Sequence, residues 1–153
     1  MKETERIKKL FEDLYDGDPW IDINLVGTLG KLSATKASRK LTPEMNSIWE
    51  IVNHLIQWRE NVLLRIQGTV IKTPSHNYFT PVASTTAAAW KKTLERLGAS
   101  QQSWLDYLER LNTGSLNKIY PGNNMTYYEH IQGILQHDAY HLGQIVLLLK
   151  ATG

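Results

Sequence analysis

The sequence predicts an all-α protein, a four-helix bundle with crossover loops. Three observations support this fold class. Apolar residues recur at steps of three and four over four separate stretches, which is the periodicity of amphipathic helices. No stretch alternates apolar and polar residues over a length that would predict a strand. Two connections between the helical stretches are long, as in bundles whose loops cross from one end to the other.

Turn and capping residues place the ends of the predicted helices. Gly17 stops the first helix, and the second long helix begins at Asn46 or Ser47, where Glu50 is placed to close a capping box. The predicted helices are residues 4–15, 24–32, 47–67, 85–111 and 125–150, the last with Asn124 as its N-cap. The predicted loops are residues 33–43, 69–80 and 112–124.

Length and composition limit the function classes. The chain has 153 residues, and we expect residues 1–153 to form one helical domain. A formal net charge of +2, with acids and bases interspersed, is too small to favour a nucleic-acid partner. The chain has no cysteine, which excludes disulfides and thiolate metal sites. Because the sequence shows no signal peptide and no membrane-spanning run, we expect a cytoplasmic protein without a membrane partner.

Two histidines near the C-terminal end of the sequence carry the strongest functional signal. His137 and His141 are four residues apart, so on a helix their side chains lie on the same face. Both belong to the apolar row of the last predicted helix, which is Tyr127, His130, Ile134, His137, His141, Ile145 and Leu148. Imidazole nitrogens are costly to bury without a partner. The pattern therefore favours either a metal site or histidines that form hydrogen bonds in the core.

In a helical bundle, a third metal ligand would come from another helix. His54 is the best-placed candidate, because it lies at the edge of the apolar row of the second long helix. Three neutral imidazoles suit a divalent metal, with zinc or nickel favoured, and they leave a coordination position open. His130 precedes His137 by roughly 10 Å along the helix axis and is too distant to share an ion. His76 lies in a loop and is expected to face solvent.

Several other side chains are candidates for supporting the histidines. Glu50 stands four residues before His54, and Gln57 and Gln144 each stand three after a histidine, where they could orient an imidazole. Asp138 points away from the histidine row and is expected to be a solvated carboxylate. Aromatic residues that could wall a pocket near the metal are Trp20, Trp58, Tyr78 and Phe79.

The order and spacing of these motifs resemble a known family. Residues 47–60, SIWEIVNHLIQWRE, look like the second-helix signature of the DinB/YfiT-like superfamily, and residues 137–145, HDAYHLGQI, resemble its closing HxxxHxxQ helix. The turn at residues 17–20, GDPW, fits the subgroup of damage-inducible DinB-like proteins. The resemblance implies an up-down-down-up four-helix bundle, often a homodimer, in which His54, His137 and His141 hold a divalent metal.

A three-histidine site with an open position supports more than one activity. The resemblance favours a thiol-dependent S-transferase acting on a small electrophile, because some relatives use bacillithiol or mycothiol as a low-molecular-weight co-substrate. A hydrolase that activates a metal-bound water is the alternative, and Glu50 would be its candidate base, although helix capping is the expected role of Glu50. A third reading is a stress-related dimeric binding protein without catalysis, whose structural metal takes a fourth ligand such as His76. The sequence assigns no catalytic residue.

Overall fold

The computed structural model describes residues 1–153 and is all-helical, which confirms that the chain is all-α. Its helices are α1 (Glu3–Tyr15), α2 (Leu25–Leu29), α3 (Ala34–Ser38), α4 (Ile48–Arg65), α5 (Ala87–Arg110), the 3₁₀ helix η1 (Thr113–Asn117) and α6 (Tyr127–Thr152). The only extended pairing is an isolated bridge between Ile119 and Thr126. None of the helices combines the length and the apolar character needed to span a membrane.

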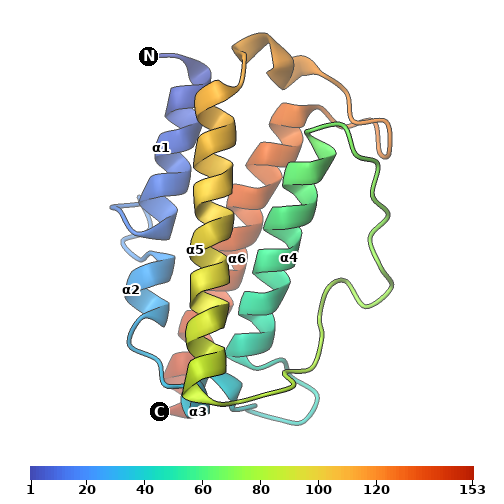
Figure 1. Ribbon diagram of the computed structural model, residues 1–153. Coiled ribbons are helices and arrows are strands. Elements are labelled where there is room, and N and C mark those ends of the chain that lie inside the picture. Colours follow the sequence, from blue (N-terminus) through green and yellow to red (C-terminus); the bar gives the residue numbers. More distant parts are fainter.

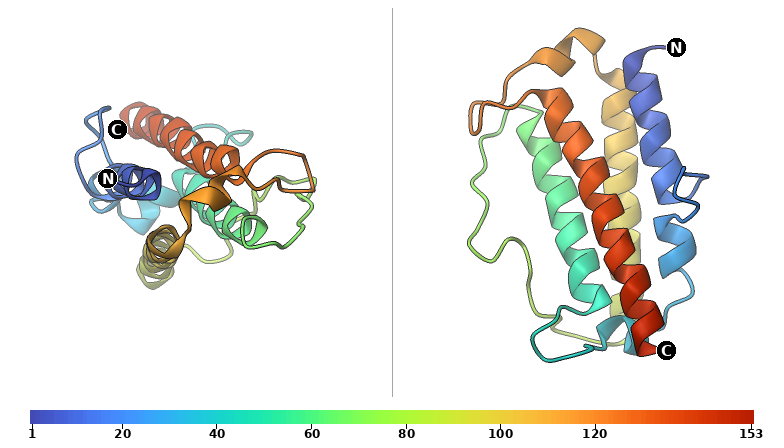
Figure 2. Two further views of the ribbon diagram at one scale, coloured as in Figure 1. Left: turned by 90° about the horizontal axis from the view of Figure 1, so that it is seen from above. Right: turned by 180° about the vertical axis from the view of Figure 1, so that it is seen from behind.

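Four long helices, α1, α4, α5 and α6, lie side by side (Figure 1). Contacts join α1 to α5, α5 to α4, α4 to α6, and α6 back to α1, so the four helices surround one core. Figure 1 shows α4 and α5 running in one direction and α1 and α6 in the other. The long segment between α4 and α5 runs along the outer side of α4, as both side views show (Figures 1 and 2). This crossover brings a loop to the two helices that carry the histidines.

The helix starts follow local capping chemistry. Ser47 caps α4: its hydroxyl accepts from the Glu50 N–H at 3.2 Å, and the Glu50 carboxylate accepts from the Ser47 N–H at 2.7 Å. This predicted capping box is confirmed. The prediction of Asn124 as the N-cap of α6 is wrong. Thr126 caps this helix instead, because Glu129, three residues further on, completes a second capping box with it.

The segment 33–43, predicted as a loop, contains the short helix α3. The Ser33 hydroxyl accepts from the Lys36 N–H at 3.2 Å and caps this helix. Ala34 and Ala37 are buried against the bundle, where α3 contacts α4 and α5. A single helical turn with two small apolar residues leaves no periodic pattern, so the sequence alone did not reveal it.

A buried charged network joins the four long helices. Arg59 of α4 donates from Nη1 to Asp138 Oδ2 of α6 at 2.7 Å, and its Nη2 donates to Gln101 of α5. Gln101 in turn donates to the backbone carbonyl of Phe11 in α1 at 3.1 Å. The prediction that Asp138 is solvated is wrong, since only 1% of its surface is exposed. A quarter turn away from the histidine row leads into the core because α6 packs against helices on two sides.

Candidate metal centre

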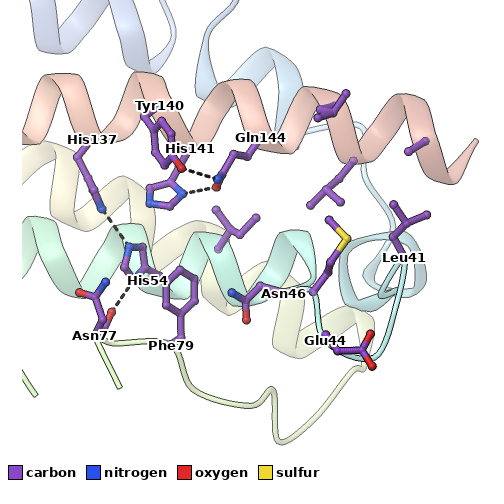
Figure 3. A pocket seen from close by; sticks show the side chains of 15 residues that line it. Leu41, Glu44, Asn46, His54, Asn77, Phe79, His137, Tyr140, His141 and Gln144 are labelled. Carbon is purple, nitrogen blue, oxygen red and sulfur yellow. Dashed lines mark hydrogen bonds between the residues drawn. The ribbon is translucent and has the colours of Figure 1, made fainter. Parts of the chain in front are cut away.

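Three histidines from two helices meet at one place in the core. His54 comes from α4, and His137 and His141 come from α6, one helical turn apart. One ring nitrogen from each residue lies within 4.8 Å of the others (Figure 3). The side chains predicted as a ligand set are therefore brought together, and no other group of histidine and acidic side chains in the chain is spaced to hold a metal ion.

Hydrogen bonds fix the orientation of two of the three imidazoles. His54 Nδ1 lies 2.7 Å from the backbone carbonyl oxygen of Asn77, and His141 Nδ1 lies 2.6 Å from Gln144 Oε1 (Figure 3). Because both oxygens only accept, each Nδ1 carries the proton and each Nε2 keeps its lone pair. The amide of Gln144 is oriented by its NH₂ group, which donates to the Tyr140 hydroxyl at 3.0 Å. In each of these two rings Nε2 is thus the nitrogen that can bind a metal ion.

The crossover loop holds His54 from its outer side. Asn77 and Tyr78 adopt left-handed backbone conformations, with φ of 50° and 60°, which presents the Asn77 carbonyl to the imidazole. The Asn77 side chain accepts from Trp58 Nε1 at 3.1 Å, and the Phe79 ring stacks on His54 with centroids 3.8 Å apart. The loop therefore supplies both the hydrogen bond and the ring stacking that orient His54. No pattern in the sequence marks Asn77 for this role.

Burial keeps the histidines neutral. Desolvation, with a smaller contribution from the nearby His141, lowers the pKa of His54 to about 4. Desolvation and the neighbouring His141 and His54 lower the pKa of His137 to about 3, and burial also lowers the pKa of His141. At pH 7 all three rings are in the form that binds metals. His137 Nδ1 is buried without a hydrogen-bond partner. A cluster of three neutral imidazoles, two of them with the proton held on Nδ1, fits a divalent metal ion.

Other candidates have different roles. His76 Nδ1 accepts from the Tyr78 N–H at 3.1 Å, which shapes the loop, and His76 is not part of the cluster. His130 Nε2 pairs with Asn123 Oδ1 at 3.1 Å and also lies outside it. The Glu50 carboxylate is engaged by the Ser47 N–H and by Lys40 Nζ at 3.2 Å.

Of the remaining predicted supporters, Gln144 forms a hydrogen bond with His141, and Gln57 forms none with the three histidines. Two of the aromatic candidates for a pocket wall, Trp58 and Phe79, lie against His54. Trp20 is 97% exposed and borders a different surface hollow, between α1 and α6. A separation of three residues on one helix therefore predicted the partner of His141 but not that of His54.

A cavity of about 650 Å³ opens onto the three histidines. Its walls come from α4, α6 and the segments that precede α4 and follow it, and most of the lining is apolar, including Ile51, Phe79 and Leu148. The only carboxylate at its border is Glu44, which Figure 3 shows at the far end from the histidines. The cavity thus offers space for a small molecule but no acidic or basic group beside the cluster apart from the histidines themselves.

The fold and the site define an all-α protein whose histidine cluster fits a metal-binding function. The family model of the DinB superfamily matches residues 24–145. The chain therefore belongs to the DinB superfamily, as its motifs suggested, and proteins of this kind are associated with metals. No curated protein and no solved structure gave a significant match to the chain.

Proposed function

We propose that the protein is a metal-dependent enzyme that transfers a small thiol onto an electrophilic substrate. His54, His137 and His141 would hold a divalent ion, zinc or nickel, within one domain of residues 1–153 built as an up-down-down-up four-helix bundle. The observation that carries the proposal is the composition of the 650 Å³ cavity: it ends on three neutral imidazoles and is otherwise mainly apolar. A bound divalent ion would lower the pKa of a thiol and hold it as the thiolate, which is the nucleophilic form.

The residues of the chain support thiol transfer in specific ways. The sulfur would form a bond to the electrophilic carbon of the substrate, whose leaving group departs with its electron pair, and the thiol proton passes to solvent. Phe79 and the aliphatic walls give the cavity a mainly apolar lining, which suits a small apolar electrophile. Asn77 and Gln144 hold two of the imidazoles, so the nitrogen lone pairs are oriented before an ion binds.

Hydrolysis is the alternative activity, and the surroundings of Glu50 argue against it. A hydrolase gains from a general base within hydrogen-bond reach of the attacking water. Glu50, the candidate base, caps α4 and pairs with Lys40, and it does not border the cavity. A purely structural metal is disfavoured as well, because a structural zinc site is normally closed by four protein ligands and His76 is held in the loop instead. We further propose a cytoplasmic homodimer with a stress-related role, as the family resemblance implies.

The proposal is tested with protein loaded with zinc or nickel, a panel of small thiols, and an electrophile whose conjugation is followed by absorbance. We expect a rate that requires metal and saturates with one class of thiol. His137→Ala should abolish this rate, while Gln132→Leu, on the same helix but away from the histidines and from the cavities beside them, should preserve it. A rate no higher than that of metal-free protein with every thiol would refute the transferase. Release of product from ester substrates without thiol would favour the hydrolase.

A further inference from the structure

A second cavity lies on the other side of His137. Its volume is about 310 Å³, and it shares His137 and Asn77 with the first cavity. Arg65, from the last turn of α4, borders it. The histidine cluster therefore has an apolar chamber on one side and a chamber with a guanidinium group on the other.

Arg65 is a buried cation without an anionic partner. Only 6% of its surface is exposed, and none of the ion pairs in the structure includes it. Its Nη2 donates to Thr73 Oγ1 at 2.9 Å, but its Nε has no hydrogen-bond partner. The guanidinium is held between two rings, with Cζ 5.4 Å from the Trp58 ring centroid and 5.6 Å from that of Tyr120. A buried charge is costly unless it is paired, so this arrangement needs an explanation.

The other buried arginine of the same helix shows what a paired guanidinium looks like. Arg59 is 1% exposed and meets the Asp138 carboxylate at 2.7 Å in the core. Arg65, by contrast, has no carboxylate paired with it and borders the second cavity. The contrast indicates that the counter-charge of Arg65 is supplied from outside the chain.

The other titratable groups of the second cavity do not fill this role. Glu129 borders it, but its Oε2 accepts from the Thr126 N–H and hydroxyl at 2.6 and 2.8 Å and caps α6. His130 also borders it and is bound to Asn123, and burial lowers its pKa, so it carries no charge at neutral pH. Arg65 is therefore the one cation facing the cavity.

We propose that the second cavity binds a carboxylate group of the thiol co-substrate, with Arg65 as its counter-charge. This inference rests on the proposed thiol transfer and adds that the thiol is an acidic molecule of roughly tripeptide length. The Trp58 ring bridges the two sites, 5.4 Å from Arg65 Cζ and 5.7 Å from the His137 ring. An extended peptide of three residues, at about 3.5 Å per residue, would reach from Arg65 to His137. The electrophile would then occupy the larger, apolar cavity.

Gly133 provides a way to block the second cavity without touching Arg65. It borders this cavity, and a Cβ atom added to it meets no atom within 4 Å. Gly133→Leu places a side chain in the open space and also replaces a poor helix former in α6. Gly143→Leu is the matched control, because Gly143 is equally unobstructed, lies in the same helix and borders neither cavity.

The test is a titration of the metal-free protein with glutathione, an acidic tripeptide thiol, and with its dimethyl ester. Binding is followed by the Trp58 indole N–H resonance, assigned with Trp58→Phe. We expect the diester and the Arg65→Gln variant each to weaken binding about tenfold or more, as for a lost charged hydrogen bond. Gly133→Leu should abolish binding and Gly143→Leu should match the wild type. Circular dichroism of each variant checks that the helices are retained.

The outcomes separate this inference from the proposed activity. Glutathione binding that is the same in Arg65→Gln and the wild type, or undetectable at millimolar concentration in the wild type, would overturn the carboxylate site even if thiol transfer takes place. Binding that depends on Arg65 and is blocked by Gly133→Leu supports the site, and it would do so even if the metal-loaded protein transferred no thiol.

Discussion

The Nε2 atoms of His54 and His137 lie 3.0 Å apart and join α4 to α6. Because the Nδ1–H of His54 donates to the Asn77 carbonyl, the Nε2 of His54 carries no proton. It therefore accepts a hydrogen bond from the Nε2–H of His137. His137 Nδ1 is then left without a proton and without a partner. The metal-free cluster is thus held by one hydrogen bond between two nitrogens that belong to the candidate ligand set.

Removing a histidine of the cluster is expected to abolish stoichiometric metal binding. Two remaining imidazoles leave a site too weak to retain an ion through gel filtration. The measurement is elemental analysis of His54→Ala, His137→Ala and His141→Ala after loading with zinc or nickel. His130→Ala is the control and should retain as much metal as the wild type. One metal per chain in any of the three variants would show that the ligand set is misassigned.

The metal-free protein should lose stability as the pH falls from about 6.5 towards 4. The pKa of His54 is lowered to about 4 and that of His137 to about 3, from the ordinary value of 6.5, so the unfolded chain binds more protons over this interval. The free energy of unfolding therefore rises with pH there and levels off above about 6.5. Urea denaturation at a series of pH values measures this slope.

His137→Phe isolates the contribution of one ring to this pH dependence. The variant cannot titrate at position 137, so its slope between pH 4 and 6.5 should be shallower. Burial raises the pKa of Asp138 to about 6, which acts in the opposite direction, but this carboxyl is present in both proteins. An unchanged slope in His137→Phe would mean that the buried histidines do not govern acid stability.

Gln144→Leu should weaken metal binding about 10- to 100-fold, the usual effect of losing a group that orients a ligating histidine. The variant removes the oxygen that accepts from His141 Nδ1 at 2.6 Å. Competition with a chromophoric chelator measures the affinity. Gln132→Leu is a matched control, because Gln132 donates to Tyr128 Oη at 3.2 Å as Gln144 does to Tyr140, away from the histidines. Equal affinities in the two variants would rule out an orienting role.

Asp138→Asn should destabilise the fold by about 3–5 kcal/mol, because it leaves the buried Arg59 guanidinium without its counter-charge. The control is Glu60→Gln, which breaks the exposed pair with Arg96 and should change stability by about 1 kcal/mol or less. Urea denaturation at pH 7 compares the two. A loss for Asp138→Asn no greater than for Glu60→Gln would mean that the buried pair contributes little.

Local features of the fold were predictable because they depend on residues close together in the sequence. The apolar periodicity marked the long helices, and the capping box at Ser47 fixed the start of α4. The pairing of His141 with Gln144 likewise depends on a separation of three residues in one helix. A local prediction was wrong where two nearby residues could both act as a helix cap. For α6 the cap is Thr126, not the predicted Asn124.

Several other features, formed by distant segments, could not be predicted. Asp138 was predicted to be solvated because its partner, Arg59, lies 79 residues away in the sequence. The Asn77 carbonyl reaches His54 through a left-handed backbone at φ 50°, which a side-chain pattern does not encode. The lack of an anionic partner for Arg65 is likewise visible only when every side chain around it is placed.

The sequence alone determined that this is an all-α chain with the DinB motifs and with His54, His137 and His141 on apolar helix faces. Helical periodicity is a property of each segment, so it can be seen without knowing how the segments pack. Only the tertiary structure decided that the three imidazoles face one another, because this depends on how α4 packs against α6. The same packing decided that the crossover loop orients one of them and that cavities border the cluster on two sides.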